Sequence, residues 1–123
     1  MSPTPTTPTP ATPGLRLEAR SMDQPDESKS PPHSRVETVR LQGKTFTRYT
    51  FLPGFHWKDD VGPLLKTDHC PGTHFMYQVS GRLRVRMKDG TEAVLGPGEA
   101  QVIPPGHDVW VLGDEPFVGI TID

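Results

Sequence analysis

The chain has 123 residues, which is enough for one compact domain and too few for two. Thirteen Lys and Arg against fifteen Asp and Glu give a net charge of −2, so no basic surplus favours nucleic acid or an anionic membrane as a partner. No apolar stretch approaches the roughly 20 residues of a membrane-spanning helix, and the single cysteine, Cys70, cannot form an internal disulfide. We therefore expect a soluble, cytoplasmic protein that binds neither nucleic acid nor membranes.

Residues 1–34 are predicted to form a disordered tail. They hold eight of the fifteen prolines and only six apolar residues, arranged as a Pro/Thr run over residues 1–14 and a second polar stretch over residues 23–34. Such a segment buries too little apolar surface to offset the entropy lost when a chain becomes ordered. We expect the folded domain to span residues 35–123 and the tail to be dispensable for its stability.

From residue 35 onward, apolar and polar residues alternate with a period of two, which is typical of half-buried β-strands. Gly- and Pro-rich turns separate short strands at intervals of about 8 to 12 residues, a spacing that indicates a β-sandwich or a small barrel. No helical segment is expected. The predicted strands are residues 36–41, 44–51, 75–79, 82–88, 91–95, 100–103, 109–112 and 117–122.

The predicted strand over residues 82–88 has the clearest alternation. Leu83 and Val85 alternate with Arg side chains, so the apolar side is expected to face the core and the basic side to face water. Asp89-Gly90 follows at once, and this dipeptide favours a type I′ hairpin turn. We therefore predict a hairpin that returns through residues 91–95.

Donor groups for a metal ion are concentrated between residues 67 and 74. Imidazoles and thiols bind Zn, Fe, Ni or Cu when they are deprotonated, so this segment is a candidate metal site. A further imidazole, His107, follows the turn Pro104-Pro105-Gly106, whereas His56 is interpreted as a surface histidine. The donors within residues 67–74 are Asp68, His69, Cys70 and His74.

The segment from residue 67 to Gly81, the Gly-Pro-Gly-Glu turn at residues 96–99 and Ile-Pro-Pro-Gly-His at residues 103–107 resemble the two sequence motifs of the cupin superfamily. The resemblance covers residues 44 to 123. In the second cupin motif, the ligand histidine comes three residues after the glycine of Pro-x-Gly, a position that Val109 occupies here. His107 lies two residues earlier, which places it on the same face of a strand.

In the first cupin motif, two histidines precede a glutamate that lies seven residues before a glycine. With Gly81 as that glycine, His74 stands where the glutamate would be. Strand parity favours Cys70 as the ligand that accompanies His74, because both positions are even and would lie on one strand face. Pro71-Gly72 between them can reset this phase. The histidine pair is replaced by Asp68 and Cys70 or by Thr67 and His69, depending on the gap.

The resemblance implies an all-β fold, the double-stranded β-helix or jelly-roll barrel of RmlC-like cupins, with a variant metal motif. The implied ligands are Cys70, His74 and His107, with His69 or Asp68 as a fourth. A thiolate in this set would favour Zn, Fe, Ni or Cu over Mg or Ca.

Inside such a barrel, alternate residues of each strand converge on a cavity that can take a small-molecule ligand. Cupin barrels serve as isomerases, decarboxylases, cyclases, dioxygenases and binding modules. The resemblance therefore implies a metal-dependent enzyme acting on a small organic acid or a phenolic metabolite. The alternatives are a metal-free binding or sensing module and a structural dimer whose cavity is filled by side chains. Candidate cavity residues are Met76, Gln78, Gln101, Trp110 and, as the one cation that could reach the interior, Arg48.

The predicted strand over residues 36–41 suggests a homodimer. If this strand forms a sheet edge, Val36, Val39 and Leu41 would be exposed on a monomer. Pairing through this outer strand would cover them.

Overall fold

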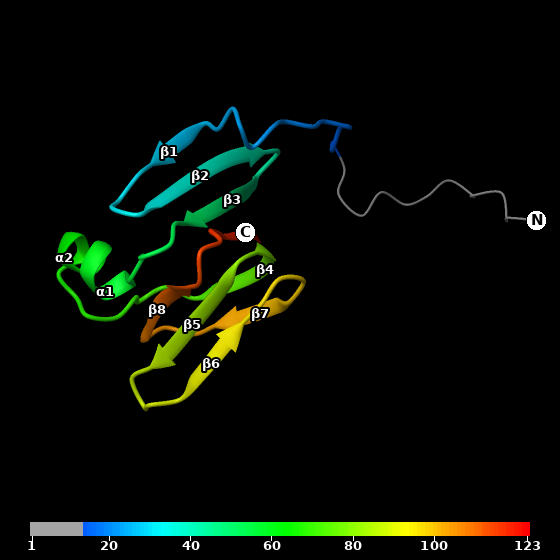
Figure 1. The fold of residues 1–123 in the computed structure, drawn as a ribbon. Helices are drawn as coiled ribbons and strands as arrows, with labels where there is room; N and C mark the ends of the chain where they lie inside the picture. The colour runs from blue at the N-terminus through cyan, green and yellow to red at the C-terminus, as the bar shows by residue number, and fades with distance from the viewer. Residues whose placement is uncertain (1–13) are drawn as a thin grey trace, which may run out of the picture.

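The computed structural model describes residues 14–123, which form two antiparallel sheets facing each other across a core (Figure 1). The elements are β1 (Glu27–Lys29), β2 (Ser34–Leu41), β3 (Lys44–Phe51), α1 (Trp57–Asp60), α2 (Gly62–Leu65), β4 (His74–Ser80), β5 (Arg82–Met87), β6 (Glu92–Leu95), β7 (Ala100–Ile103), β8 (His107–Leu112) and β9 (Phe117–Ile122). The larger sheet has the strand order β1-β2-β3-β9-β4-β7, and the smaller one has the order β6-β5-β8. The prediction of an all-β jelly-roll architecture is confirmed.

Neighbours within each sheet are often far apart along the chain. The last strand, β9, lies between β3 and β4, with Gly119 opposite both Tyr49 and Gln78. In the smaller sheet, β5 pairs with β6 through the predicted hairpin and with β8 on its other side. This topology brings the start of β4 and the start of β8 to the same end of the barrel.

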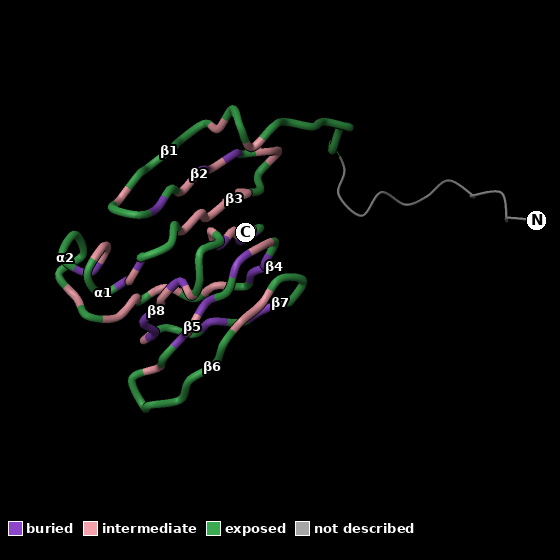
Figure 2. The backbone as a smooth tube through the Cα atoms, viewed as in Figure 1, coloured by how far each residue is buried: buried purple, intermediate pink, exposed green. Residues whose placement is uncertain are grey.

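The core lies between the two sheets and confirms the predicted phase of β5 (Figure 2). Leu83 and Val85 are buried, whereas Arg82 and Arg86 are exposed and Arg84 is half-buried. Alternation along the strand thus sends one row of side chains into the core and the other to the surface. The buried apolar residues are Phe55, Trp57, Met76, Leu83, Val85, Ile103, Val109, Val111 and Phe117.

The segment from residue 14 to residue 34 belongs to the folded domain, which corrects the predicted boundary at residue 35. β1 pairs with β2, with Ser28 opposite Glu37. The Asp26 carboxylate accepts a hydrogen bond of 2.8 Å from the backbone N–H of Arg40. Backbone pairing stabilises this polar segment without apolar burial, so a composition argument misses it. The Pro/Thr run of residues 1–13 lies outside the described residues.

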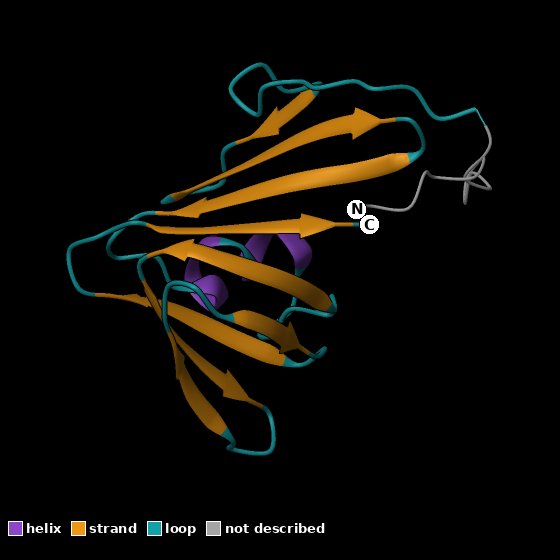
Figure 3. Cartoon of the chain, turned by 90° about the vertical axis from the view of Figure 1, so that its right-hand side faces the viewer, coloured by secondary structure: helices purple, strands orange, loops and turns teal. Residues whose placement is uncertain are grey.

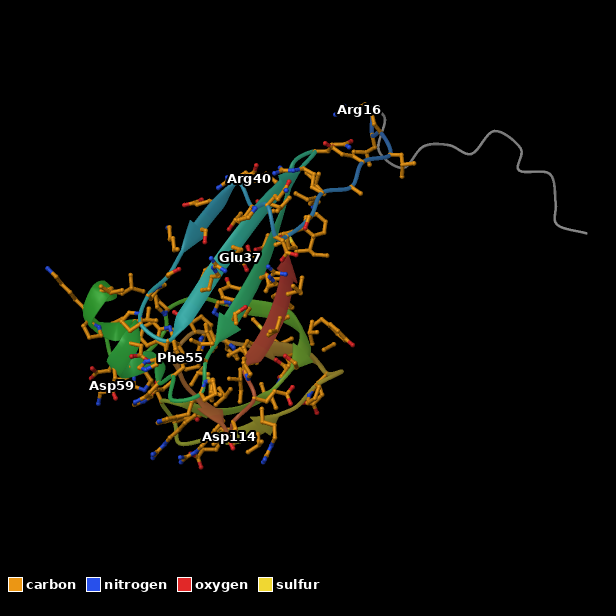
Figure 4. The ribbon with its side chains drawn as sticks, turned by 45° about the horizontal axis from the view of Figure 1, so that its top comes forward. Arg16, Glu37, Arg40, Phe55, Asp59 and Asp114 are labelled. Carbon is orange, nitrogen blue, oxygen red and sulfur yellow. The ribbon has the colours of Figure 1, made fainter. Side chains whose placement is uncertain are left out.

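The outer face of β2 and β3 is covered, which corrects two predictions. β2 is flanked by β1 and β3 and is not a sheet edge, and Val39 is only 1% exposed because the N-terminal segment packs over this face. Arg48 points to the same outer face, away from the cavity. Its guanidinium donates to Glu37 at 2.9 Å and to Asp23 at 2.8 Å, so it does not reach the barrel interior. Glu37, labelled on β2 in Figure 4, is buried beneath this contact.

Two short helices follow β3, which corrects the expectation that no helix would form. Both lie on one side of the larger sheet (Figure 3). Pro63 stands at the start of α2, where its missing N–H costs nothing, and Lys66 ends the helix in the left-handed conformation. The loop and α1 bury Phe55 and Trp57 against the strands, and Figure 4 places Phe55 between α1 and the sheets. Among the described residues, no helix is long and apolar enough to span a bilayer.

Candidate metal centre and ligand cavity

A cavity of about 150 Å³ lies between the two sheets. Strands from both sheets contribute to its wall, and α1 and the segment before β2 complete it. The third expected possibility, a barrel filled by side chains, is therefore contradicted. The lining residues are Pro31, Ser34, Val36, Tyr49, Phe51, Trp57, Val61, Cys70, His74, Met76, Leu83, Ile103, His107, Val109 and Phe117.

Cys70 is held beside His107 by two backbone hydrogen bonds. The N–H of Cys70 donates to the carbonyl of His107 at 2.9 Å, and the N–H of Gly106 donates to the carbonyl of Cys70 at 2.8 Å. These residues are far apart in sequence, so the isolated bridge joins two segments that topology alone brings together. It places the thiol next to the first residue of β8.

His74, the first residue of β4, completes a cluster of three donor groups. Its Nε2 atom lies 3.7 Å from the Sγ atom of Cys70, and its ring centroid lies 5.1 Å from that of His107. One donor atom from each residue lies within 4.8 Å of the other two. His107 and Val109 both line the cavity, as their shared strand parity predicts.

The two imidazoles are in the protonation state that metal binding needs at neutral pH, whereas the Cys70 thiol must lose its proton. Burial lowers the pKa of His74 and that of His107, so both imidazoles are neutral and present lone pairs. The Nδ1 atom of His107 lies 2.6 Å from the carbonyl oxygen of Pro104. When Nδ1 donates its proton to this carbonyl, Nε2 is free to act as a ligand. Burial raises the pKa of the Cys70 thiol, although the Gly72 N–H, 3.4 Å from Sγ, counteracts this by stabilising the thiolate.

The donor separations fit a transition-metal ion. On a tetrahedral ion with one sulfur and one nitrogen ligand, neighbouring donor atoms lie about 3.6 Å apart. The 3.7 Å between Cys70 Sγ and His74 Nε2 matches this value, and the largest separation of 4.8 Å closes with small side-chain rotations. A mixed set of one thiolate and two imidazoles suits Zn, Fe, Ni or Cu.

The two predicted alternatives for a fourth ligand lie elsewhere. His69 and Asp68 line a groove on the surface of the protein, together with Lys58, Arg86 and Trp110. Neither belongs to the three-residue cluster among the described residues. The chain bends at Asp68 and His69, just before the bridge at Cys70, and their side chains line the surface groove and not the cavity.

The predicted ligand contacts of Gln78 and Gln101 are replaced by a hydrogen bond between the two side chains, which leaves the buried Gln101 Oε1 atom without a hydrogen-bond partner among the described residues. Both are buried, and the Gln101 amide donates to the Gln78 side-chain oxygen. The Gln78 amide also donates to the carbonyl of Gly81 at 2.8 Å. Neither glutamine lines the cavity, whereas Met76, two residues before Gln78, does.

Trp110 lies on the outer side of β8 and not in the cavity, which corrects its predicted place. Its ring stacks on His56 at a centroid distance of 4.5 Å, and the Arg84 guanidinium lies 4.8 Å from its centroid on the ring face. His56 is more than a surface histidine, because its Nε2 atom lies 2.7 Å from the buried carboxylate of Asp108. This contact ties the loop before α1 to β8.

The aromatic wall of the cavity was missed by the sequence analysis. Tyr49 packs edge-on against His74, with ring centroids 5.7 Å apart, and burial raises its pKa. Phe51 stacks on Phe55 at 4.1 Å and on Phe117 at 5.2 Å. The period-two pattern of β3 already places Tyr49 and Phe51 on one face, so this signal was present in the sequence.

Solved structures with similar folds were found despite low sequence identity. FeII HppE superposes with a TM-score of 0.59 at 10% identity, covering 86% of this chain and 59% of that chain. A protein of unknown function from Acidithiobacillus ferrooxidans has the same TM-score at 13% identity, covering 91% and 97%. A cupin-like protein from Thermotoga maritima has a TM-score of 0.50 at 19% identity, covering 73% and 67%. The chain has a cupin-like fold.

The cupin-like barrel spans less than two thirds of the HppE chain, so the rest of HppE has no counterpart in it. No protein-family model matches the sequence, and no curated protein does either. At these identities the structures show a shared fold and not a shared activity.

Proposed function

We propose that the chain binds a divalent transition metal through Cys70, His74 and His107 and holds a small uncharged molecule, such as a phenol, in the adjoining cavity. The observation that carries the proposal is the placement of all three donors in the wall of this cavity, within 4.8 Å of one another. The iron named for FeII HppE, which has a similar fold, supports a metal in a barrel of this kind.

The shape and lining of the cavity limit the ligand. A volume of about 150 Å³ is that of an engineered protein cavity that binds benzene, so one six-membered ring fills it. Among the described residues that line it, none is Lys or Arg, so a free carboxylate would have no cationic side chain to pair with. This favours a phenolic ligand over an organic acid.

Within the site, each group has a distinct task. Cys70, His74 and His107 would hold the ion, which would supply Lewis acidity to an oxygen atom of the ligand. Phe51, Trp57 and Phe117 would enclose the ring and exclude water. The reaction class we propose is a metal-assisted isomerisation, cyclisation or oxygenation, whereas a decarboxylation would need a carboxylate substrate, which this cavity disfavours. A thiol that is free for ligation also supports a reducing compartment such as the cytosol.

One observation favours a second function, ligand binding or sensing without turnover. The described cavity residues include no Asp, Glu or Lys, so proton transfer would rest on the imidazoles, Cys70 and Tyr49. A receptor needs no such group, whereas most acid–base enzymes do.

Metal analysis of the purified protein tests the proposal. Protein produced with Fe, Zn, Ni and Cu supplied should retain close to one ion per chain, and Cys70→Ser and His74→Ala should each lose most of it. The matched control is His69→Ala, because His69 is the neighbouring imidazole but lies in the surface groove. Cobalt(II) should give a sulfur-to-metal charge-transfer band that Cys70→Ser abolishes. Stoichiometric metal in both ligand variants, or none in the wild type, would refute the site.

A pH titration of metal affinity gives an independent check. Because the pKa of the Cys70 thiol is raised, metal binding must displace its proton, and the apparent affinity should rise about tenfold per pH unit through the neutral range. In Cys70→Ser the residual affinity should lack this dependence. Phenol should raise the Tm of the metal-loaded protein, and benzoate should raise it less.

A further inference from the structure

The outer face of β9, β4 and β7 is an open apolar surface, here called the open face. Phe75 is 65% exposed, Val102 is 62% exposed and Tyr77 is 52% exposed, and the side chains surround a shallow hollow. The pairing registers place Phe75 opposite Val102, and Tyr77 opposite both Ala100 and Ile120. The outward residues of the three strands are Phe75, Tyr77, Val79, Ala100, Val102, Val118, Ile120 and Ile122.

The other half of the same sheet is already covered. Over β2 and β3, the outward-facing Val39 is 1% exposed and Glu37 is 4% exposed, because the N-terminal segment packs there. In Figure 1 this segment, in blue, lies beside β1 and β2 and away from β4 and β7. The N-terminal segment thus covers the outer face of β2 and β3. Among the described residues, no segment covers the open face.

We propose that the open face is covered by the open face of a second copy of this chain, giving a two-fold symmetric dimer. All eight outward residues are uncharged, so two identical faces meet without like charges opposing each other. Two-fold symmetry requires this self-complementarity, because each residue meets the same patch on its partner.

The size of the open face fits a dimer. Its two aromatic and several aliphatic side chains, each about half to two thirds exposed, present roughly 500 Å² of apolar surface, a patch at the upper range for a monomer. A standard interface buries about 800 Å² per partner, of which about 60% is apolar. The exposed apolar area therefore matches the apolar share of one half-interface.

The chain's own first residues fit this surface poorly. Residues 1–13 contain Met1 and Ala11 as their only apolar residues other than proline. They offer little apolar surface to match two aromatic rings and a row of aliphatic side chains. Although Phe75 adjoins His74 along β4, the two side chains line opposite faces of the sheet, so the proposal stands independently of metal binding.

Sedimentation velocity of the full chain over a range of concentrations tests the dimer. The wild type should have twice the mass of one chain, whereas Val102→Arg and Tyr77→Arg should each have the mass of one chain. The matched control is Val94→Arg on β6, where the native side chain is 56% exposed but belongs to the smaller sheet; this variant should remain a dimer.

Phe75→Gln adds no charge and serves as a milder variant if either arginine variant fails to fold. Far-ultraviolet circular dichroism checks that each variant is folded. Phe75→Gln should weaken the dimer while keeping the native spectrum. A monomeric wild type at every concentration would overturn the proposal. A dimer that persists in the folded Val102→Arg and Phe75→Gln variants, or that is lost in Val94→Arg, would overturn it as well.

Discussion

Replacing Leu83 by Asp should unfold the domain, whereas the same change at the neighbouring Arg84 should be tolerated. Leu83 is 2% exposed and lines the cavity, on the inward side of β5. Arg84 points outward, pairs with Glu92 and covers one face of the Trp110 ring. The two substitutions therefore place a carboxylate on opposite sides of a single strand.

The expected costs differ several-fold. Removing a buried leucine side chain costs about 2–5 kcal/mol. Keeping the new carboxyl group neutral at pH 7, about three units above its ordinary pKa, costs about 4 kcal/mol more. The sum approaches the roughly 5–15 kcal/mol by which small domains are stable. At Arg84, the loss of an exposed ion pair and a cation–π contact amounts to about 1–2 kcal/mol.

Urea unfolding followed by circular dichroism and tryptophan fluorescence measures both effects. Burial would raise the pKa of the introduced Asp, so the Leu83→Asp protein should gain stability as the pH falls and lose it as the pH rises. Leu83→Asn, which has no charge, should show no such gain. Equal stability of Leu83→Asp and Arg84→Asp at pH 7 would refute the assignment of the inward face.

Two further predictions concern Gly119, which lies beside the cavity residue Met76, and His56, which joins the loop before α1 to β8. Gly119→Ala should cost about 1–3 kcal/mol in urea unfolding and reduce the ligand's effect on Tm, because a Cβ atom there would lie 2.4 Å from the Met76 sulfur and force that side chain to move. At His56, burial alone would lower the pKa, but hydrogen bonds to Asp108 and Asp59 outweigh it and raise the pKa. The protonated ring should therefore stabilise the fold fully below about pH 6.5, and the stability difference between wild type and His56→Gln should shrink as the pH rises through the folded-state pKa.

Local patterns predicted the parts of the fold that depend on local chemistry. The alternation along β5 placed Leu83 and Val85 inside, and Asp89-Gly90 marked the hairpin, because a strand's two faces and a tight turn are encoded by adjacent residues. The grouping of Cys70 with His74 also follows from short-range spacing. These inferences needed no knowledge of which strands are neighbours.

Features that depend on sheet order were beyond such patterns. The outward direction of Trp110 and Arg48 depends on which face of each sheet packs against the other sheet, and period two fixes only the relative phase along one strand. The four-residue helices are too short to show a helical period, although Pro63 at a helix start was a readable signal. β1 gains its stability from pairing with β2 and carries no apolar pattern of its own.

The segment before β2 has two attachments at once. Pro31 forms part of the cavity wall, and residues before it pair with β2 through β1 and contact Arg48 on the outer face of the same sheet through Asp23. Detachment of this segment from the sheet, by a partner or by force, would therefore also open the cavity. By thermodynamic reciprocity, a ligand that fills the enclosure tightens the segment's attachment by the same free energy. Attachment of the segment before β2 and ligand binding in the barrel are therefore thermodynamically coupled, although the attachment and the ligand lie on opposite faces of one sheet.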